Sequence, residues 1–188
     1  MILSDRDIIK AISKGDIKIS PFVEDFIQPA SIDLTLASTI RSFVFDSTTY
    51  VDVKDLKDYS KEIDLKENGY FFIYPNDFIL GATVETITLP NYLAAKVDGR
   101  SSLARLGLMI QASASYIAPG FSGNLTLEIK NISQIPVKLY VGVRIAQIIF
   151  EVMSSPSINP YGSSGSNHKY QNQQKPTPSK LWQDFKDF

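Results

Sequence analysis

A cluster of hydroxyl and guanidinium side chains in the middle of the chain could bind a phosphate or polyphosphate. Residues 98–102 read Asp-Gly-Arg-Ser-Ser, and a helix-compatible run, Leu-Ala-Arg-Leu, follows at 103–106. A helix that begins within the serine pair would point its free backbone N–H groups at a bound anion, and Arg100 would add side-chain donors there. An ordinary serine N-cap, with Arg100 and Arg105 in solvent, explains the same residues. That second interpretation is favoured on this pattern alone.

A carboxylate follows on a predicted strand. Residues 124–131 alternate between apolar and polar side chains, so Thr126, Glu128 and Lys130 share one face. Glu128 therefore projects from a rigid element and could act as a general base. The alternative is a solvated glutamate on the outer face, which the pattern by itself favours.

Composition limits the class of protein. The 188 residues are 44% hydrophobic and 21% charged, values typical of a globular domain with a sizeable core. The net charge is −1, so non-specific nucleic-acid binding is not expected. Charges appear by Asp5, which argues against a signal peptide, and no apolar run approaches the ~18–20 residues of a membrane helix. We expect a cytoplasmic protein with no membrane partner.

Composition also excludes one kind of metal chemistry. The chain has no cysteine and a single histidine, His168, so it cannot supply the His/Cys/Cys or three-cysteine ligands of a zinc-dependent cytidine deaminase. His168 itself lies in a polar tail, where a solvated loop histidine is expected. Any deamination of cytosine would therefore need a carboxylate rather than zinc to activate water.

The positioning elements are mostly short strands. Ser4 caps a predicted helix over residues 4–14, which Gly15 ends. The expected strands cover residues 16–20, 32–36, 40–45, 70–74, 78–83, 85–89, 93–97, 124–131, 137–140 and 145–152. The charge-dense segment 51–68 is interpreted as a surface excursion between strands, and Asp33 as a solvent-side or turn-stabilising acid. This pattern predicts a mainly β fold, a distorted jelly roll or β-barrel with a short N-terminal helix and a few small helices.

The composition changes after residue 153. Residues 154–178 are rich in Ser, Gly, Asn, Gln and Pro, which is typical of a mobile tail or linker. Within it, Tyr161, Lys169, Tyr170 and Gln173 supply aromatic faces, a cation and an amide that could clamp a nucleotide. Residues 181–185 could form a short amphipathic end.

Four motifs carry a resemblance to a known family. They are GRSSLARLGL at residues 99–108, YIAPGFSGNLTLE at 116–128, QPASIDL at 28–34 and KYQNQQ at 169–174. Together they closely resemble the dCTP deaminase family, a branch of the dUTPase superfamily. The resemblance implies one dUTPase-like domain over residues 1–188, whose tail, 154–188, closes over the active site.

The resemblance also implies site residues and partners. Glu128 matches the general base, with Ser101 and Arg105 beside it. The matching nucleotide-contacting positions are Arg100, Ser102, Leu103, Ala104, Ala112, Ala114, Ala118, Thr126, Leu127, Gln147, Tyr161, Lys169 and Gln173. Mg²⁺ would be carried by the triphosphate, with no ligand from a protein side chain. Family members are homotrimers with sites between subunits, and dTTP inhibits some relatives, a property left open here.

Two positions bear on which reaction is run. Ala118 stands where the family usually has an aspartate that contacts the sugar and, in dUTPase relatives, orients the hydrolytic water. Gln147 instead resembles the bifunctional branch. We predict the single-reaction, zinc-independent deaminase, a hydrolase of a cyclic amidine C–N bond that converts dCTP and water to dUTP and ammonia.

Three alternatives remain open. The first is the bifunctional dCTP deaminase that continues to dUMP and diphosphate. The second is a non-catalytic nucleotide-binding or regulatory homologue, although intact Glu128, Ser101 and Arg105 favour an enzyme. The third is a plain dUTPase, which the absence of an arginine-bearing glycine-rich motif in the tail disfavours.

Overall fold

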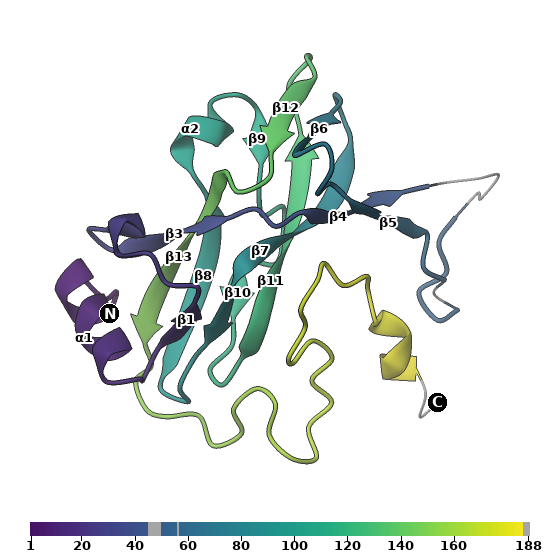
Figure 1. The fold of residues 1–188 in the computed structure, drawn as a ribbon. Helices are drawn as coiled ribbons and strands as arrows, with labels where there is room; N and C mark the ends of the chain where they lie inside the picture. Colours follow the sequence, from purple (N-terminus) through teal and green to yellow (C-terminus); the bar gives the residue numbers. More distant parts are fainter. Residues whose placement is uncertain (45–49, 56, 186–188) are drawn as a thin grey trace.

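The structure is a computed structural model that describes residues 1–44, 50–55 and 57–185. Two antiparallel sheets dominate it, and the mainly β class predicted from sequence is confirmed (Figure 1). The larger sheet has the order β5 (Ser60–Asp64), β4 (Thr39–Phe43), β7 (Phe78–Thr88), β11 (Ser122–Asn131) and β9 (Leu108–Met109), and β1 (Lys18–Ser20) also pairs with β7. The second has the order β10 (Tyr116–Ile117), β8 (Leu93–Gly99), β13 (Arg144–Val152), β3 (Ser31–Thr35) and β2 (Ile27–Gln28). A small third sheet pairs β12 (Val137–Tyr140) with β6 (Tyr70–Ile73).

The apolar sides of both large sheets contribute to one hydrophobic core. On β11, Leu125, Leu127 and Ile129 are buried, whereas the side chains between them are half-buried, as the alternation predicted. Ile148 and Phe150 of β13 lie in the same buried cluster, each with no exposed surface. Each such side chain contributes about 1.5–3 kcal/mol when it is removed from water. The buried side chains on the core-facing side of β11 therefore hold the strand that carries Glu128 rigidly in place.

The helices are few and short. Helix α1 (Asp5–Ser13) begins after Ser4, whose hydroxyl accepts a hydrogen bond from the Asp7 N–H, and Ile8 and Ala11 pack into the core. The other helical segments are η1 (Glu24–Phe26), α2 (Ser101–Ala104) and η2 (Leu181–Phe185). Across the described part of the chain, no helix is long and apolar enough to cross a membrane.

Two expectations about the strands were wrong. Residues 78–83 and 85–89 form one strand, β7, because Glu85 is buried within it and accepts hydrogen bonds from the Thr35 N–H and hydroxyl. The charged segment 51–68 contains the edge strand β5, which pairs with β4 along its whole length. Its side chains are largely exposed, so no apolar alternation marks it. The expected strand 40–45 ends within residues that lie outside the described part.

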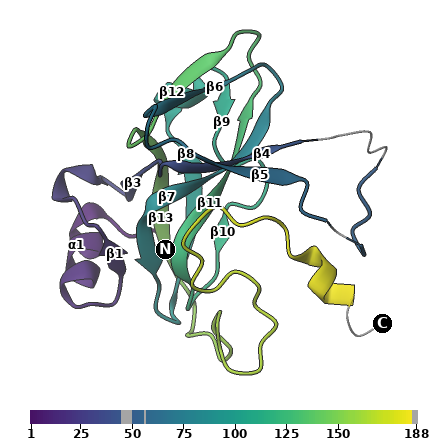
Figure 2. The same cartoon turned by 45° about the vertical axis from the view of Figure 1, so that its right-hand side comes forward.

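The tail after β13 runs along the larger sheet instead of leaving it (Figures 1 and 2). The Asn124 N–H donates to the Gln173 carbonyl at 2.9 Å, and the Asn172 N–H donates to the Ser122 carbonyl at 2.7 Å. Gly123 permits this approach, because its φ is +146° and a Cβ there would lie 2.9 Å from the Gln173 carbonyl oxygen. The tail thus pairs with the first residues of the strand that carries Glu128.

Candidate active site

A cavity of about 650 Å³ surrounds Glu128, and we call it the Glu128 cavity. Its walls come from strands β4, β7, β8, β10 and β11, from the loop after β9 and from the tail. It is lined by Phe43, Phe78, Leu80, Val97, Gln111, Ala114, Tyr116, Ile117, Ala118, Phe121, Leu125, Thr126, Glu128, Tyr161, Tyr170, Gln173, Thr177 and Ser179. Most of this surface is aliphatic or aromatic, and no lysine or arginine is among the described residues that line it. Such a surface suits a flat, partly apolar group such as a nucleobase.

Two bonds to one oxygen fix the carboxylate of Glu128. Its Oε2 accepts hydrogen bonds from the Ser113 N–H at 2.8 Å and from the Ser113 hydroxyl at 2.9 Å. The Gln111 amide oxygen accepts the Glu128 N–H at 3.4 Å, and the Gln111 amide group donates to the Ala114 carbonyl. Within the described residues, Oε1 of Glu128 has no hydrogen bond. One oxygen is therefore anchored while the other is available to take a proton, which is the arrangement that a general base requires.

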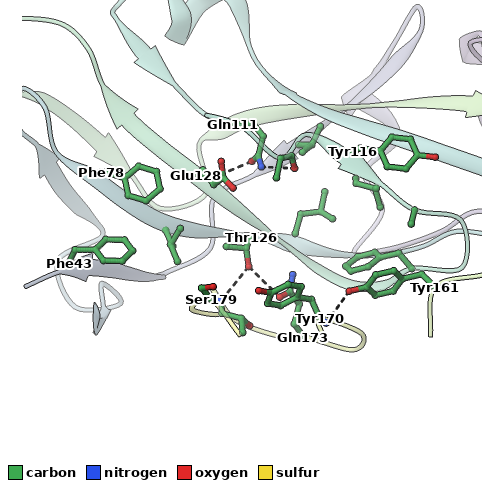
Figure 3. A pocket seen from close by; sticks show the side chains of 18 residues that line it. Phe43, Phe78, Gln111, Tyr116, Thr126, Glu128, Tyr161, Tyr170, Gln173 and Ser179 are labelled. Carbon is green, nitrogen blue, oxygen red and sulfur yellow. Dashed lines mark hydrogen bonds between the residues drawn. The ribbon is translucent and has the colours of Figure 1, made fainter. Parts of the chain in front are cut away.

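The tail supplies the opposite wall of the cavity. Figure 3 shows Tyr170, Gln173 and Ser179 on the side of the cavity away from Glu128. Thr126 lies between Glu128 and these tail residues. The Gln173 amide group donates to the Asn124 carbonyl at 2.7 Å. These contacts place polar tail groups in the wall of the cavity opposite Glu128.

Aromatic side chains order the turn of the tail. The ring of His168 stacks on that of Tyr161, with centroids 4.2 Å apart, and His168 Nδ1 accepts the Gly162 N–H at 2.8 Å. The Tyr161 hydroxyl accepts the Tyr170 N–H at 3.1 Å. The prediction of a solvated loop histidine was therefore wrong, because His168 is half-buried against an aromatic ring.

An ion pair ties the tail to the β4–β5 ribbon. Lys175 Nζ lies 2.7 Å from Glu62 Oε1, and the Thr177 N–H donates to the Thr126 hydroxyl at 3.3 Å. The hydrogen bond with Glu62 raises the pKa of Lys175 above its ordinary value. The tail is thus attached at two places, to the ribbon and to β11.

A second, polar cavity of about 280 Å³ lies at the start of α2, and we call it the Ser101 cavity. It is lined by Gln28, Pro29, Ala30, Ser31, Asp33, Arg100, Ser101, Ser102 and Gln147. Gln147 accepts the Ser31 hydroxyl at 3.2 Å and donates to the Gly99 carbonyl at 3.3 Å. Hydroxyl, amide and guanidinium donors converge here, which is the chemistry that phosphate oxygens need.

Asp33 forms the floor of this second cavity. It is 2% exposed, and its carboxylate pairs with Arg100 Nε at 3.2 Å and with Arg144 Nη1 at 3.2 Å. The prediction of a solvent-side acid was wrong, since two cations compensate the buried charge. The alternation of residues 32–36 had placed Asp33 on the polar face, and on that face the side chains of Arg100 and Arg144 pair with it.

The structure divides the predicted site residues between these two cavities. Ala114, Ala118, Thr126, Tyr161 and Gln173 line the Glu128 cavity, whereas Arg100, Ser101, Ser102 and Gln147 line the Ser101 cavity. The single chain therefore does not bring Ser101 beside Glu128. The remaining predicted positions line neither cavity: Leu103, Ala104, Arg105, Ala112, Leu127 and Lys169.

Some of these remaining side chains have other contacts. Arg105 is exposed at the C-terminal end of α2, and Leu127 is wholly buried in the core. Lys169 pairs with Asp184 of η2. Leu127 could therefore contact a nucleotide only through its backbone. Arg105 could contact only a nucleotide that is bound in the Glu128 cavity of another copy of the chain.

Sequence reasoning missed the two residues that hold Glu128. Ser113 and Gln111 lie in a loop with no strand or helix periodicity, and nothing in their spacing relates them to β11. Their role depends on the loop crossing over the strand, which is a tertiary contact.

Comparison with known proteins identifies the family. A family model described as dCTP deaminase-like matches residues 2–153. The chain belongs to the dCTP deaminase-like family. This confirms the family indicated by the sequence motifs.

Individual family members are similar along their whole length. The chain is 42% identical to "dCTP deaminase, dUMP-forming" of Nocardioides sp., over 98% of this chain and 97% of that relative. It is 45% identical to the protein of the same description in Methanosphaera stadtmanae, over 98% of this chain and 95% of that relative. A solved 2′-deoxycytidine 5′-triphosphate deaminase from Agrobacterium tumefaciens has a TM-score of 0.62 and 24% identity, over 80% of this chain and 46% of that one. The chain thus spans about half of that solved chain, and this last likeness concerns the fold.

These relatives correct the predicted reaction. The prediction of a deaminase that stops at dUTP was wrong, because full-length relatives at 42–45% identity are described as dUMP-forming. The prediction gave too much weight to the missing aspartate at Ala118. Gln147, which had indicated the bifunctional branch, was the better guide.

Proposed function

We propose that this enzyme is a bifunctional dCTP deaminase that converts dCTP and two waters to dUMP, diphosphate and ammonia. The observation that carries the proposal is the Glu128 carboxylate, anchored through Oε2 and open through Oε1 in a largely apolar cavity of about 650 Å³. The dUMP-forming relatives support the same overall reaction.

In the deamination step, water attacks C4 of the cytosine ring. Glu128 accepts a proton from this water through Oε1, so that a C–O bond forms as the ring C=N bond opens. The electron pair of the opened bond moves to N3. The same carboxyl group then returns the proton to the exocyclic nitrogen, and the C–N bond breaks to release ammonia as the electron pair on N3 re-forms the ring C=N bond. Transfer of the hydroxyl proton from the new oxygen to N3 gives uracil. Ser113 keeps the carboxylate oriented throughout, because both of its donors hold Oε2.

In the second step, water attacks the nucleotide phosphate chain. The bond between the α-phosphoryl group and the bridging oxygen of diphosphate breaks, which gives dUMP and diphosphate. Ala118 cannot orient this water through its side chain.

A complete site requires a second copy of the chain. Within residues 1–44, 50–55 and 57–185, no cationic side chain lines the Glu128 cavity, whereas a triphosphate carries several negative charges. The Ser101 cavity has the matching donors, including Arg100. We propose that the Ser101 cavity and Arg105 of one subunit meet the Glu128 cavity of its neighbour, in the homotrimer that the family resemblance implies, and that the tail closes over the nucleotide.

The remaining partners follow from the substrate. Mg²⁺ would enter with the triphosphate and take its ligands from phosphate oxygens and water, neutralising charge before the phosphate bond breaks. Among the described residues, no group of three or more His, Cys, Asp or Glu side chains could hold a metal ion. We place the reaction in the cytoplasm, with no nucleic-acid partner.

The test is a product analysis. The purified protein is incubated with dCTP and Mg²⁺, with dUTP in a parallel reaction, and products are separated by ion-exchange chromatography. We expect dUMP and diphosphate from dCTP. Accumulation of dUTP as the final product, or no turnover of dCTP, would contradict the proposal.

A further inference from the structure

Arg144 is not among the described residues that line the Ser101 cavity, and its side chain is 41% exposed. Its Nη1 is 3.2 Å from Asp33 Oδ2, and its guanidinium group lies 5.5 Å from the ring centroid of Phe26. Arg100, by contrast, lines the cavity and contacts the other carboxylate oxygen, Oδ1, through Nε at 3.2 Å. The two arginines thus share one buried carboxylate from different sides.

The contacts of Arg100 hold its position. Its Nε is fixed by Asp33, and its Nη1 donates to the Arg144 carbonyl at 3.4 Å. Its side chain is nevertheless 28% exposed, so part of the guanidinium group remains accessible from the cavity. An arginine fixed in this way loses little conformational entropy when an anion arrives.

The charge of this group depends on Arg144. Asp33 and Arg100 alone would be neutral overall, and the other lining residues of the Ser101 cavity carry no charge. With Arg144 included, one net positive charge remains beside the cavity. The attraction of an anion therefore requires a residue that does not line the cavity at all.

We propose that Arg144 is a positioning residue for polyphosphate binding. It neutralises Asp33, so that Asp33 can orient Arg100 without cancelling the positive charge that Arg100 presents to phosphate. This inference rests on the proposed function, because the anion is taken to be the phosphate chain of the nucleotide.

The experiment measures binding of inorganic pyrophosphate by titration calorimetry to the whole protein, without nucleotide. We expect Arg144→Gln to weaken binding about tenfold, because the net charge beside the cavity falls by one, whereas Arg144→Lys retains most of the affinity. Arg6→Gln, which removes the same charge from the exposed side of α1, is the matched control and should bind as the unaltered protein does.

The double variant Asp33→Asn/Arg144→Gln gives the sharper result. It restores one net positive charge at Arg100, so we expect it to bind pyrophosphate more tightly than Arg144→Gln, although it lacks both partners. A purely structural role for Arg144 would make the double variant the weaker binder. That order, or unchanged affinity in Arg144→Gln, would overturn the inference.

Steady-state kinetics with dCTP provide a second readout. Arg144→Gln should raise KM with little change in kcat, since binding and not proton transfer is affected. If the double variant does not fold, the pyrophosphate affinities of Arg144→Gln and Arg144→Lys test the inference. Equal affinities in these two variants would overturn it. The variants could bind pyrophosphate in the expected order although the protein does not turn over dCTP. That result would contradict the proposed function and still support the inference about Arg144.

Discussion

The two cavities of this chain differ in their polarity and in the contacts that hold their walls in place. The Glu128 cavity is mostly apolar, and part of its wall is a glycine- and serine-rich tail held by backbone hydrogen bonds and one exposed ion pair. The Ser101 cavity is polar, and a buried carboxylate between two arginines supports it. The first can therefore open at low energetic cost, whereas the second is fixed before any ligand arrives.

This difference suits the two ends of a nucleotide. A base must enter, react and leave, and an attached but releasable wall permits this. A phosphate chain needs donors that are already oriented, because reorganising charged groups is costly. Four substitutions, at Glu128 and at residues that hold Glu128 or the tail, would break or sharpen the comparison.

Glu128→Gln should have the largest effect. We expect deamination to fall by about a thousandfold or more, because glutamine cannot accept the proton of the attacking water. Nucleotide binding should remain measurable by calorimetry, since the side chain keeps its size. Turnover close to that of the unaltered protein would show that another group is the base.

Gly123→Ala should come next. The added Cβ would meet the Gln173 carbonyl oxygen at 2.9 Å, so the tail should detach from β11 and kcat/KM should fall about a hundredfold. Limited proteolysis should show cleavage between residues 154 and 178. Gly165→Ala is the matched control, because that glycine also has a positive φ, +78°, but no atom lies within 4 Å of its Cβ position. Equal effects in both variants would exclude the contact with Gln173 as the cause.

Ser113→Ala should have a smaller effect on the same carboxylate. It removes the hydroxyl donor to Oε2 but keeps the backbone donor, so we expect kcat to fall about tenfold, or about 1.4 kcal/mol. KM for dCTP should change little. Ser115→Ala, two residues further along the same loop, serves as the control. A change confined to KM would mean that Ser113 contacts the nucleotide instead of positioning Glu128.

Lys175→Met should have the smallest effect. The Lys175–Glu62 pair is exposed, and we expect its loss to raise KM about twofold in low salt and less in high salt. Because Glu62 raises the pKa of Lys175 above 10.5, the contribution of the pair is present below that pH and is lost as the pH rises through the folded-state value. A large effect at neutral pH in high salt would show that the ion pair matters more than the backbone contacts of the tail.

The strands and the general position of Glu128 could be predicted because periodicity reports which side of a strand is buried. The alternation over residues 124–131 placed Thr126 and Glu128 on one face, as observed. The same reasoning failed for Asp33, which it placed in solvent. Alternation indicates which side chains point away from the core, but it does not indicate which other residues pack over them. It also missed β5, whose charged residues have no buried face to report.

The arrangement of the candidate site depended on tertiary contacts that leave no pattern in a single sequence. Ser113 reaches Glu128 from a loop 15 residues away, and Gln173 reaches Asn124 across 49 residues. Family resemblance supplied Tyr161 and Gln173, which composition alone had assigned to a linker. The resemblance implied sites between subunits, but it placed Ser101 beside Glu128 and did not indicate that these two residues would lie in separate cavities of one chain.

The start of β11 has one more consequence. Asn124 holds the tail and Glu128 lines the Glu128 cavity, so four residues of a single strand, with a register shift between Asn124 and Thr126, separate the two. The strand therefore fixes the distance between the tail contact and the carboxylate, because both residues belong to one continuous strand. Loops elsewhere in the molecule can gain or lose residues without altering that span. A single insertion between Asn124 and Glu128 would shift the closing segment against the reacting group and turn alternate side chains to the wrong face.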